Sequence, residues 1–326
     1  MILAGDIGGT KTNVALLESD GDALGMVAAE RTFASGGYDS LEAILREFIA
    51  EHGSRITHAC FGVAGPVIEG HADTTNLAWD VSTSALVETL GIERVGLIND
   101  LEATAYGIQA LGPTQFRTLN SGRQKRGGNR ALIAAGTGLG MAGIVEHEGH
   151  YHPSPSEGGH IDFAPRTPEE MELLDYLSEK YDGHVSYERV LSGMGIYNIY
   201  SFLRDRGHEE EPAWLAEQIA KGDDAAAISH AALAGKSELA MRALDMFTSV
   251  YGAMAGNLAL LMVATGGLYI GGGIAPKILE KMVDGTFMRA FLDKGRFSPF
   301  VSDIPVHVIL DDKTALYGAA LYALGH

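Results

Sequence analysis

Two short glycine-rich segments, each between two strand-forming runs, constrain this 326-residue chain more than any other feature. The first is Gly8-Gly9-Thr10, and the second covers residues 136–140. Because glycine lacks a Cβ, the backbone can turn tightly there and bring its N–H groups close to phosphate oxygens. Two such hairpins can also arise independently. The repeated strand–turn–strand pattern nevertheless predicts two related halves of one α/β fold, each presenting a phosphate loop to a shared cleft.

Hydrophobic periodicity predicts the elements around these turns. Residues 41–51 place their apolar side chains on one helical face, with Asp39 or Ser40 as the cap. Residues 167–264 are expected to be mainly helical, and residues 120–130 read as a loop or domain crossing. Further strands are predicted at 58–63, 95–98, 130–135, 141–145, 268–270 and 306–310, and further helices at 101–111 and 314–323.

Charge and cysteine content exclude several classes of protein. The formal net charge is −18, and so acidic a surface repels nucleic acid and anionic membranes. An anionic nucleotide would need local donors such as backbone N–H groups or a helix end. Cys60 is the single cysteine, which excludes a disulfide framework and a Cys-rich zinc site. We expect Cys60 to be buried packing in a protein of the reducing cytosol.

One apolar stretch needs to be distinguished from a membrane span. No charged residue occurs from 246 to 276, but seven glycines and Asn257 interrupt the stretch. We predict a buried helix that ends near Gly266-Gly267, followed by a buried strand. A strand begins at the first residues without a signal-peptide pattern, so we expect a soluble, cytoplasmic protein.

The dipeptide Asn99-Asp100 is the first candidate for chemistry. It follows a hydrophobic strand and opens a predicted helix, at the edge where open α/β sheets place their active sites. Asp100 could accept a proton from a sugar hydroxyl, while Asn99 binds another hydroxyl. The alternative is a helix N-cap, for which both residue types are preferred.

Two further segments carry polar side chains suited to sugar binding. Glu157 and His160 flank two glycines, so neither is expected inside a regular helix. Carboxylates and imidazoles can hydrogen-bond pairs of sugar hydroxyls. A metal site formed by Glu157, His160 and Asp162 is the weaker alternative, because zinc sites usually gather His and Cys. For Glu188, the alternative is a surface salt bridge with Arg189 or Lys180.

The phosphate-binding candidates do not match the common nucleotide motifs. Asp6 beside the first glycine turn could hold Mg²⁺ through water, and Gly271-Gly272-Gly273 is a third loop, between a strand and a helix. Residues 136–140 lack the dinucleotide-binding spacing, and no Walker A or protein-kinase set is present. Phosphate loops without those motifs indicate the actin and sugar-kinase architecture.

Together these runs resemble the bacterial ATP-dependent glucokinase family, of the hexokinase–actin superfold. The matching runs are residues 5–10, 75–79, 97–100, 135–140, 157–165, 188–193, 271–276 and 294–297. Lys11-Thr12 is closer to the related repressor/kinase sugar-kinase group. That group often has a Cys-rich zinc motif after its Gly-His, which this chain cannot form, so the zinc-free branch is favoured.

The resemblance implies the roles of individual residues. Asp100 falls on the catalytic base, and no metal-ligating residue is implied. The implied sugar-binding residues are Asn76, Asn99, Asp100, Glu157, His160 and Glu188. The implied nucleotide-binding residues are Gly5, Asp6, Ile7, Gly8, Gly9, Thr10, Gly136, Thr137, Gly138, Gly271, Gly272 and Gly273.

The resemblance also implies an architecture and a reaction. We expect a two-domain actin/hexokinase-like (ribonuclease H-like) α/β fold with an inter-domain cleft. Residues 1–110 and 299–326 would form the smaller domain, and 111–298 the larger. The family is commonly homodimeric and phosphorylates glucose with ATP and Mg²⁺. Another sugar or acetate as acceptor, polyphosphate as a second donor, and a non-catalytic sugar sensor remain alternatives. A sensor would need a DNA-binding module, for which we expect no room before Gly5.

Overall fold

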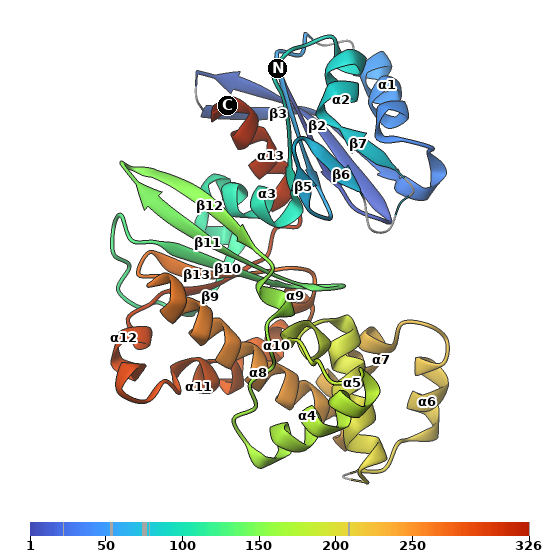
Figure 1. The fold of residues 1–326 in the computed structure, drawn as a ribbon, viewed down its shortest axis with the longest axis vertical. Helices are drawn as coiled ribbons and strands as arrows, with labels where there is room; N and C mark the ends of the chain where they lie inside the picture. The colour runs from blue at the N-terminus through green and yellow to red at the C-terminus, as the bar shows by residue number, and fades with distance from the viewer. Residues whose placement is uncertain (22, 53–54, 74–76, 78, 208, 326) are drawn as a thin grey trace. The chain divides into compact units, whose positions relative to one another are not determined.

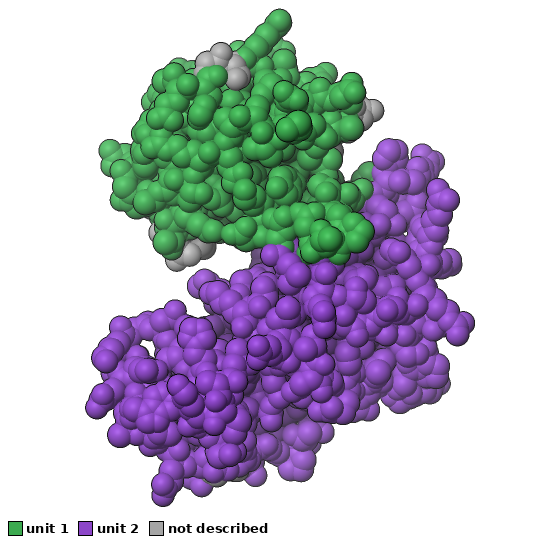
Figure 2. All heavy atoms as spheres, turned by 180° about the vertical axis from the view of Figure 1, so that it is seen from behind, with its two compact units in different colours: residues 1–115, 152–154, 311–326 green, residues 116–151, 155–310 purple. Residues whose placement is uncertain are grey.

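The computed structural model describes all residues except 22, 53–54, 74–76, 78, 208 and 326. Its ribbon is shown in Figure 1. The chain divides into two compact units, which Figure 2 colours separately. Unit 1 comprises residues 1–115, 152–154 and 311–326, and unit 2 comprises residues 116–151 and 155–310.

Unit 1 is built on a five-stranded sheet in the order β3-β2-β1-β4-β8. The first three strands form an antiparallel meander, and β1, β4 and β8 are parallel. The strands are β1 (Ile2–Ile7), β2 (Lys11–Asp20), β3 (Ala23–Ala34), β4 (His58–Val63) and β8 (Val95–Asn99). A smaller sheet contains β5 (Val67–Ile68), β6 (His71–Asp73) and β7 (Asp80–Ser82).

Helices cover both faces of the unit 1 sheet, because successive strand residues point to opposite faces. Leu3 and Ile7 of β1 pack with α1 (Leu41–His52) and α2 (Thr83–Leu90). Ile2 and Ala4 pack instead with α3 (Asp100–Gly107) and α13 (Thr314–Gly325). Cys60 is fully buried in this second layer, which confirms its predicted place in the core. Short 3-10 turns η1 (Ser35–Gly37), η2 (Ile108–Ala110) and η3 (Pro113–Gln115) join the elements.

Helices α3 and α13 touch through their backbones at two glycines. A Cβ on Gly318 would lie 1.6 Å from the carbonyl oxygen of Ala103, and one on Gly107 would lie 1.9 Å from that of Thr314. No side chain fits at either point. The two glycines therefore set how closely α3, which begins at Asp100, packs on α13.

Unit 2 repeats the strand arrangement of unit 1. Its sheet has the order β12-β11-β10-β13-β14-β9, with β10 and β11 antiparallel and β10, β13 and β14 parallel. The shared order agrees with the expectation of two related halves. The strands are β9 (Phe116–Asn120), β10 (Arg130–Ala135), β11 (Leu139–His147), β12 (His150–Ser156), β13 (Gly267–Gly271) and β14 (Val306–Ile309).

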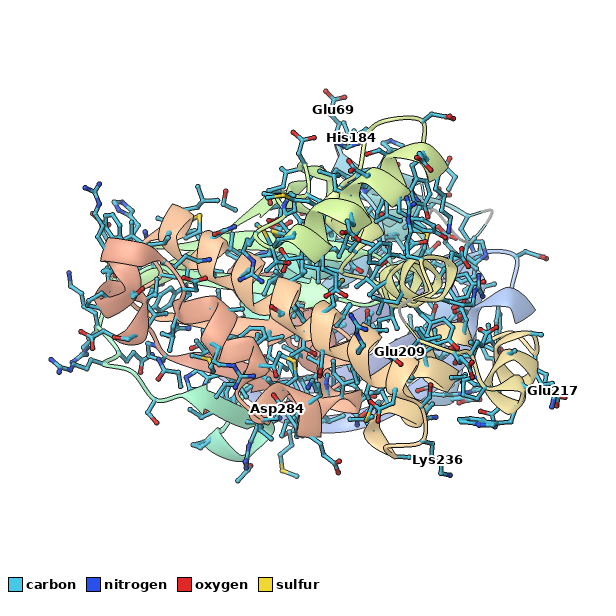
Figure 3. All side chains as sticks on the ribbon, turned by 90° about the horizontal axis from the view of Figure 1, so that it is seen from below. Glu69, His184, Glu209, Glu217, Lys236 and Asp284 are labelled. Carbon is cyan, nitrogen blue, oxygen red and sulfur yellow. The ribbon has the colours of Figure 1, made fainter. Side chains whose placement is uncertain are left out.

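The rest of unit 2 is mainly helical, as predicted for residues 167–264. Helix α8 (Glu238–Met262) is the centre of this part and packs on α5, α7, α11 and β10. Exposed Glu217 and Lys236, neither of which belongs to α8, project outward from this helical part of the unit (Figure 3). The other helices are α4 (Pro168–Lys180), α5 (Gly193–Asp205), α6 (Ala213–Ile219), α7 (Asp224–Leu233), α9 (Ile274–Lys277), α10 (Leu279–Val283), α11 (Thr286–Leu292) and α12 (Ser298–Ser302), with 3-10 turns η4 (Gly158–His160), η5 (Tyr187–Arg189) and η6 (Gly295–Phe297).

The α/β fold class predicted from the sequence is confirmed, and most predicted elements lie where expected. Ser40 accepts the N–H of Ala43 at 3.3 Å, so it caps α1. The apolar stretch forms α8 and β13, but the helix ends at Met262, because Val263 turns into the left-handed region (φ 49°). None of the helices within the described residues is both long enough and apolar enough to cross a bilayer.

The contact between α3 and α13 gives a stability prediction. Gly318→Ala forces the two backbones apart and should lower the free energy of unfolding by about 1–3 kcal/mol or more. Gly325→Ala is a matched control on the same helix, because its Cβ would meet nothing within 4 Å. Urea unfolding of both variants checks this. Equal stabilities for the two variants would contradict the packing argument.

Candidate functional site

The first glycine turn lies at the carboxyl end of β1 and is held by Ser35. The Gly8 N–H donates to the Lys11 carbonyl at 3.0 Å, and the Ser35 hydroxyl donates to the Gly8 carbonyl at 2.7 Å. The Ser35 N–H donates to the Thr10 carbonyl at 3.0 Å. Within the described part of the chain, no acceptor is present for the N–H groups of Gly9 and Thr10. The turn therefore presents two backbone donors, as an anion site requires.

Gly5 and Ile7 belong to β1 itself and position this turn. Ile7 is buried in the core, and a Cβ on Gly5 would lie 2.5 Å from the Phe61 ring. Both residues are part of the ladders that β1 forms with β2 and β4. Their place in the middle of the sheet fixes where Asp6 and the Gly8 turn lie.

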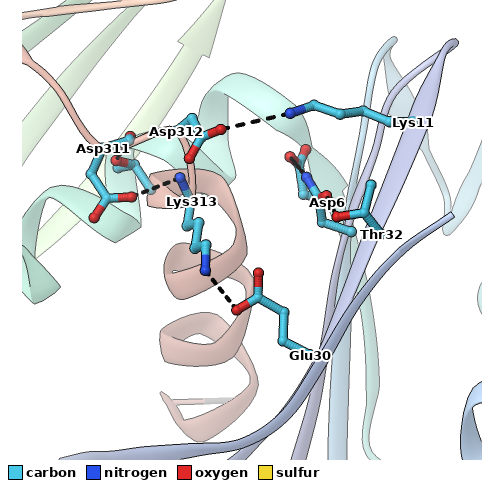
Figure 4. A network of polar contacts seen from close by, with 9 residues as sticks. Asp6, Lys11, Glu30, Thr32, Asp311, Asp312 and Lys313 are labelled. Atoms are coloured by element: carbon cyan, nitrogen blue, oxygen red, sulfur yellow. Dashed lines mark hydrogen bonds and ion pairs between the residues drawn. The ribbon is translucent and has the colours of Figure 1, made fainter.

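Asp6 is held in a polar chain beside the turn. Asn13 donates from Nδ2 to the Asp6 carboxylate at 3.3 Å and accepts from Thr32 Oγ1 at 2.8 Å. Burial raises the pKa of Asp6, which Asn13 and Lys11 partly offset. Lys11 also reaches Asp312 at 3.7 Å (Figure 4), and the Asp312 carboxylate raises the Asp6 pKa further. Two carboxylates and one ammonium group thus lie at one edge of unit 1.

Asn99 and Asp100 occupy the same edge, at the end of β8. Asn99 caps α3, because its Oδ1 accepts the N–H groups of Leu101 at 2.9 Å and Glu102 at 3.4 Å. Its Nδ2 donates to the Gly65 carbonyl at 2.9 Å. The N-cap alternative is therefore confirmed for Asn99, which keeps one amide N–H for another acceptor.

The Asp100 carboxylate has an unusual electrostatic environment. Burial is the largest effect and raises its pKa to about 6, and the negative charge of Asp6 adds to the rise. The Leu101 N–H, which donates to Asp100 Oδ1 at 2.8 Å, offsets part of it. A carboxylate with a pKa near neutrality is suited to accept a proton from a hydroxyl group.

In unit 2, the second glycine turn joins β10 to β11 and is fixed to the segment that follows. The Gly136 N–H donates to the Gly138 carbonyl, and the Gly193 N–H at the start of α5 donates to the Gly136 carbonyl, both at 2.9 Å. The Leu139 N–H donates to Glu188 Oε2 at 2.9 Å. A Cβ on Gly138 would lie 2.5 Å from that same oxygen. Gly138 therefore gives Glu188 room to reach the backbone of the turn.

The salt-bridge alternative for Glu188 does not hold among the described residues. Lys180 donates to Asn198 Oδ1 at 2.8 Å, and the Arg189 guanidinium lies over the Tyr181 ring, 4.2 Å from its centroid. Glu188 directs one oxygen to Leu139 instead. Its other oxygen can bind a hydroxyl group.

The positions of Glu157 and His160 are set by Gly159, one of the two glycines between them, which packs against Leu139 of β11. Leu139 is also the residue whose N–H binds Glu188. Glu157 and His160 flank Gly158 and Gly159 of η4, a single 3-10 turn, which confirms that neither lies in a regular helix. A Cβ on Gly159 would lie 2.0 Å from the Leu139 carbonyl oxygen, so only glycine fits there. His160 Nε2 lies 3.8 Å from Glu157 Oε2, and both side chains are exposed. Leu139 thus brings Glu157, His160, Glu188 and the glycine turn together.

The third glycine loop lies beside the second, because β10 and β13 are neighbouring parallel strands. Gly272 has φ +79°, and a Cβ there would lie 2.3 Å from the Ala135 carbonyl oxygen. Gly271 ends β13, and Gly273 precedes α9. The backbones of the two loops are therefore in contact at one edge of the unit 2 sheet.

A pocket of about 390 Å³ opens between these two loops. Such a volume is typical of small-molecule sites. Gly136, Thr137 and Gly273 line one side, and residues of α5, α7 and α9–α10 line the rest. Those further residues are Gly193, Ile196, Asp223, Ala225, Ala226, Ser229, His230, Ile274, Lys277 and Ile278.

Apart from the glycine loops, the residues that line this pocket were not predicted from the sequence. Asp223 caps α7 by accepting the N–H of Ala226 at 3.1 Å, so residues 223–226 read only as an ordinary helix start. His230 follows on the same helix without any motif around it. Only the tertiary packing of α7 on α5 shows that these residues face the glycine loops.

The described residues contain no group of three or more His, Cys, Asp or Glu side chains arranged to hold a metal ion. Asp162 was the third residue of the alternative metal site with Glu157 and His160. Its Oδ1 lies 3.1 Å from His184 Nε2. Asn76, expected to bind sugar, lies outside the described residues.

The raised pKa of Asp100 predicts a pH-dependent effect on stability. The ordinary carboxyl pKa is 3.8, so the folded protein holds a proton between pH 3.8 and about 6 that the unfolded chain has lost. The stabilising contribution is complete below pH 3.8 and is lost as the pH rises through 6. Asp100→Asn, which keeps an acceptor for Leu101, should therefore raise the free energy of unfolding by about 1–3 kcal/mol at pH 8, and by less at pH 4.5.

Urea unfolding at both pH values measures this difference. Asp20→Asn, at the exposed end of β2, is the control and should leave the stability unchanged at either pH. A destabilised Asp100→Asn protein at pH 8 would show that ionised Asp100 is not strained by burial.

Comparisons with known proteins show the family of the whole chain. The glucokinase family model matches residues 3–326. A glucokinase of Nostoc sp. is 42% identical, with 99% of this chain and 98% of the relative covered. The crystal structure of a glucokinase from an Antarctic psychrotroph has a TM-score of 0.88 at 32% identity, covering 100% of this chain and 99% of the other.

A more distant structure shares the fold. It is a ROK family glucokinase from Streptomyces griseus in complex with glucose and AMPPNP, with a TM-score of 0.63 at 20% identity, covering 100% of this chain and 99% of the other. The family model and the relatives cover the chain almost end to end, as the predicted resemblance required. This chain belongs to the glucokinase family.

Proposed function

We propose that this protein transfers the γ-phosphoryl group of ATP to the 6-hydroxyl of D-glucose, giving glucose 6-phosphate and ADP. The observation that carries the proposal is the Asp100 carboxylate, at the carboxyl edge of the unit 1 sheet with a pKa of about 6. It is ionised above that pH and still basic enough to take the proton of a primary alcohol as the alcohol attacks phosphorus.

The nucleotide would be bound by the glycine loops and the pocket between them. The apolar side chains of Ile196, Ile274 and Ile278 suit an adenine ring, and Asp223 and His230 can hydrogen-bond a ribose. The N–H groups of the Gly8 and Gly136 turns would donate to phosphate oxygens. The AMPPNP complex of the Streptomyces relative supports an adenine nucleotide as donor.

ATP supplies the transferred phosphoryl group, and Mg²⁺ bound to it neutralises charge on the phosphates. We propose that this ion is carried by the nucleotide. Asp6 would hold such an ion through water, since Asn13, at 3.3 Å, is the single hydrogen-bond donor to its carboxylate among the described residues.

The sugar would be bound by side chains of both units. Asp100 and Asn99 of unit 1 would contact it together with Glu157, His160 and Glu188 of unit 2, and with Asn76. We propose that the two units act as the two domains of the kinase. We further propose a cytoplasmic homodimer.

An assay of ADP formation from ATP against a panel of sugars tests the function. Glucose should give the highest kcat/KM, and Asp100→Ala should lower kcat by about 10²–10⁴-fold. In the wild type, kcat/KM for glucose should fall as the pH drops below about 6, because Asp100 becomes protonated. A higher kcat/KM with another hexose, or with acetate, would show that this compound rather than glucose is the acceptor. Nucleotide binding without turnover would instead favour a sugar sensor.

Glu157→Gln and Glu188→Gln should mainly weaken sugar binding. Loss of a charged hydrogen bond costs about 1.5–3 kcal/mol, which corresponds to roughly a ten- to hundredfold rise in the KM for glucose. The KM for ATP should change little. Steady-state kinetics with each substrate varied separately measures both values, and an unchanged glucose KM in both variants would argue against this sugar pocket.

A further inference from the structure

Asn198 is a fully buried polar residue that the proposed chemistry does not use. It lies on α5 and has 0% exposure. A buried amide is costly unless its hydrogen bonds are made, so a position of this kind usually fixes a local geometry. The groups that satisfy it therefore show which geometry it fixes.

The Asn198 amide is bonded on both sides. Its Nδ2 donates to the Arg189 carbonyl at 2.8 Å and to the Tyr181 hydroxyl at 3.1 Å. Its Oδ1 accepts from Lys180 Nζ at 2.8 Å and lies 3.2 Å from the Tyr181 hydroxyl. The contact with Arg189 is made to the backbone of η5, one residue after Glu188.

The other contacts hold the same short turn. The Ser192 hydroxyl donates to the Glu188 carbonyl at 2.7 Å, and the Arg189 guanidinium lies over the Tyr181 ring that borders Asn198. Two successive carbonyls of η5 are thus bound by side chains of the α5 N-cap and α5 itself. The Glu188 side chain extends from this turn to the Leu139 N–H at 2.9 Å.

We propose that Asn198 is a positioning residue for sugar binding, which acts by holding η5 so that the Glu188 carboxylate stays on the Leu139 N–H with one oxygen directed to the sugar. The inference rests on the proposed function, because it assumes that Glu188 contacts glucose. Asn198 itself would touch neither substrate.

The test uses Asn198→Asp and Asn198→Ala in the full-length protein. An aspartate keeps the shape and the contact with Lys180, but it has no N–H for the Arg189 carbonyl. Both variants should raise the KM for glucose about tenfold, while the KM for ATP and kcat stay within about twofold. Ser201→Ala is the matched control, because Ser201 is also buried on α5 and its hydroxyl has no partner among the described residues.

The Glu188→Gln variant distinguishes a failure of this inference from a failure of the proposed function. If Glu188→Gln raises the glucose KM but the Asn198 variants do not, the positioning role is wrong and the function stands. If Glu188→Gln leaves it unchanged, both the Glu188 contact and the role of Asn198 are wrong. The Glu188→Gln/Asn198→Asp double variant should have the glucose KM of Glu188→Gln alone. If the two increases in the glucose KM instead multiply in the double variant, Asn198 affects sugar binding by a route other than Glu188, and the inference is wrong.

A structural defect alone would give a different pattern. General loosening of α5 would also raise the KM for ATP, because Gly193 and Ile196 of that helix line the nucleotide pocket. Parallel rises in both KM values would therefore overturn the inference. Thermal unfolding shows whether each variant is folded, and Asn198→Asp serves if Asn198→Ala does not fold.

Discussion

The backbone of Leu139 is the contact on which the unit 2 part of the site depends. Its N–H binds Glu188 at 2.9 Å, and its carbonyl packs against Gly159 so closely that a Cβ would lie 2.0 Å away. It directly follows the glycine turn of residues 136–138. One strand residue therefore fixes the glycine turn, Glu157 with His160, and Glu188 relative to one another. Glycines at 138 and 159 are needed because both approaches leave no room for a side chain.

The unit 1 part of the site depends on the Asp100 carboxylate, which lies where ionisation is energetically costly. Burial and the charge of Asp6 raise the pKa of Asp100 to about 6, and hydrogen bonds from the backbone N–H groups of Leu101 and Asp100 and from the Asn99 side chain offset only part of this rise. Burial of Asp100 therefore lowers the stability of the folded protein at neutral pH and makes this carboxylate more basic. The backbone contact between Gly107 and α13 maintains this environment, because it sets the packing of the helix that begins at Asp100.

Much of the fold could be predicted from the sequence because the local signals agree with the final structure. The limits of β4 and β10 match the predicted strands, since short apolar runs between turn residues leave little ambiguity. Strand β3 was not predicted, because its residues are mostly exposed and lack an alternating pattern. The roles proposed for Asp100 and Glu188 rest on the resemblance, since a helix cap and a surface salt bridge fit the same residues in the sequence. Asp223, His230 and Asn198 gave no signal, because only packing among α5, α7 and η5 reveals their surroundings.

A crystal structure with glucose and a non-hydrolysable ATP analogue would test the central claim most directly. We expect Glu188 to keep one oxygen on the Leu139 N–H while its other oxygen accepts from a sugar hydroxyl. We also expect the Asp100 carboxylate to lie within hydrogen-bond distance of the 6-hydroxyl. A sugar bound away from Glu188, or with another hydroxyl facing Asp100, would contradict it.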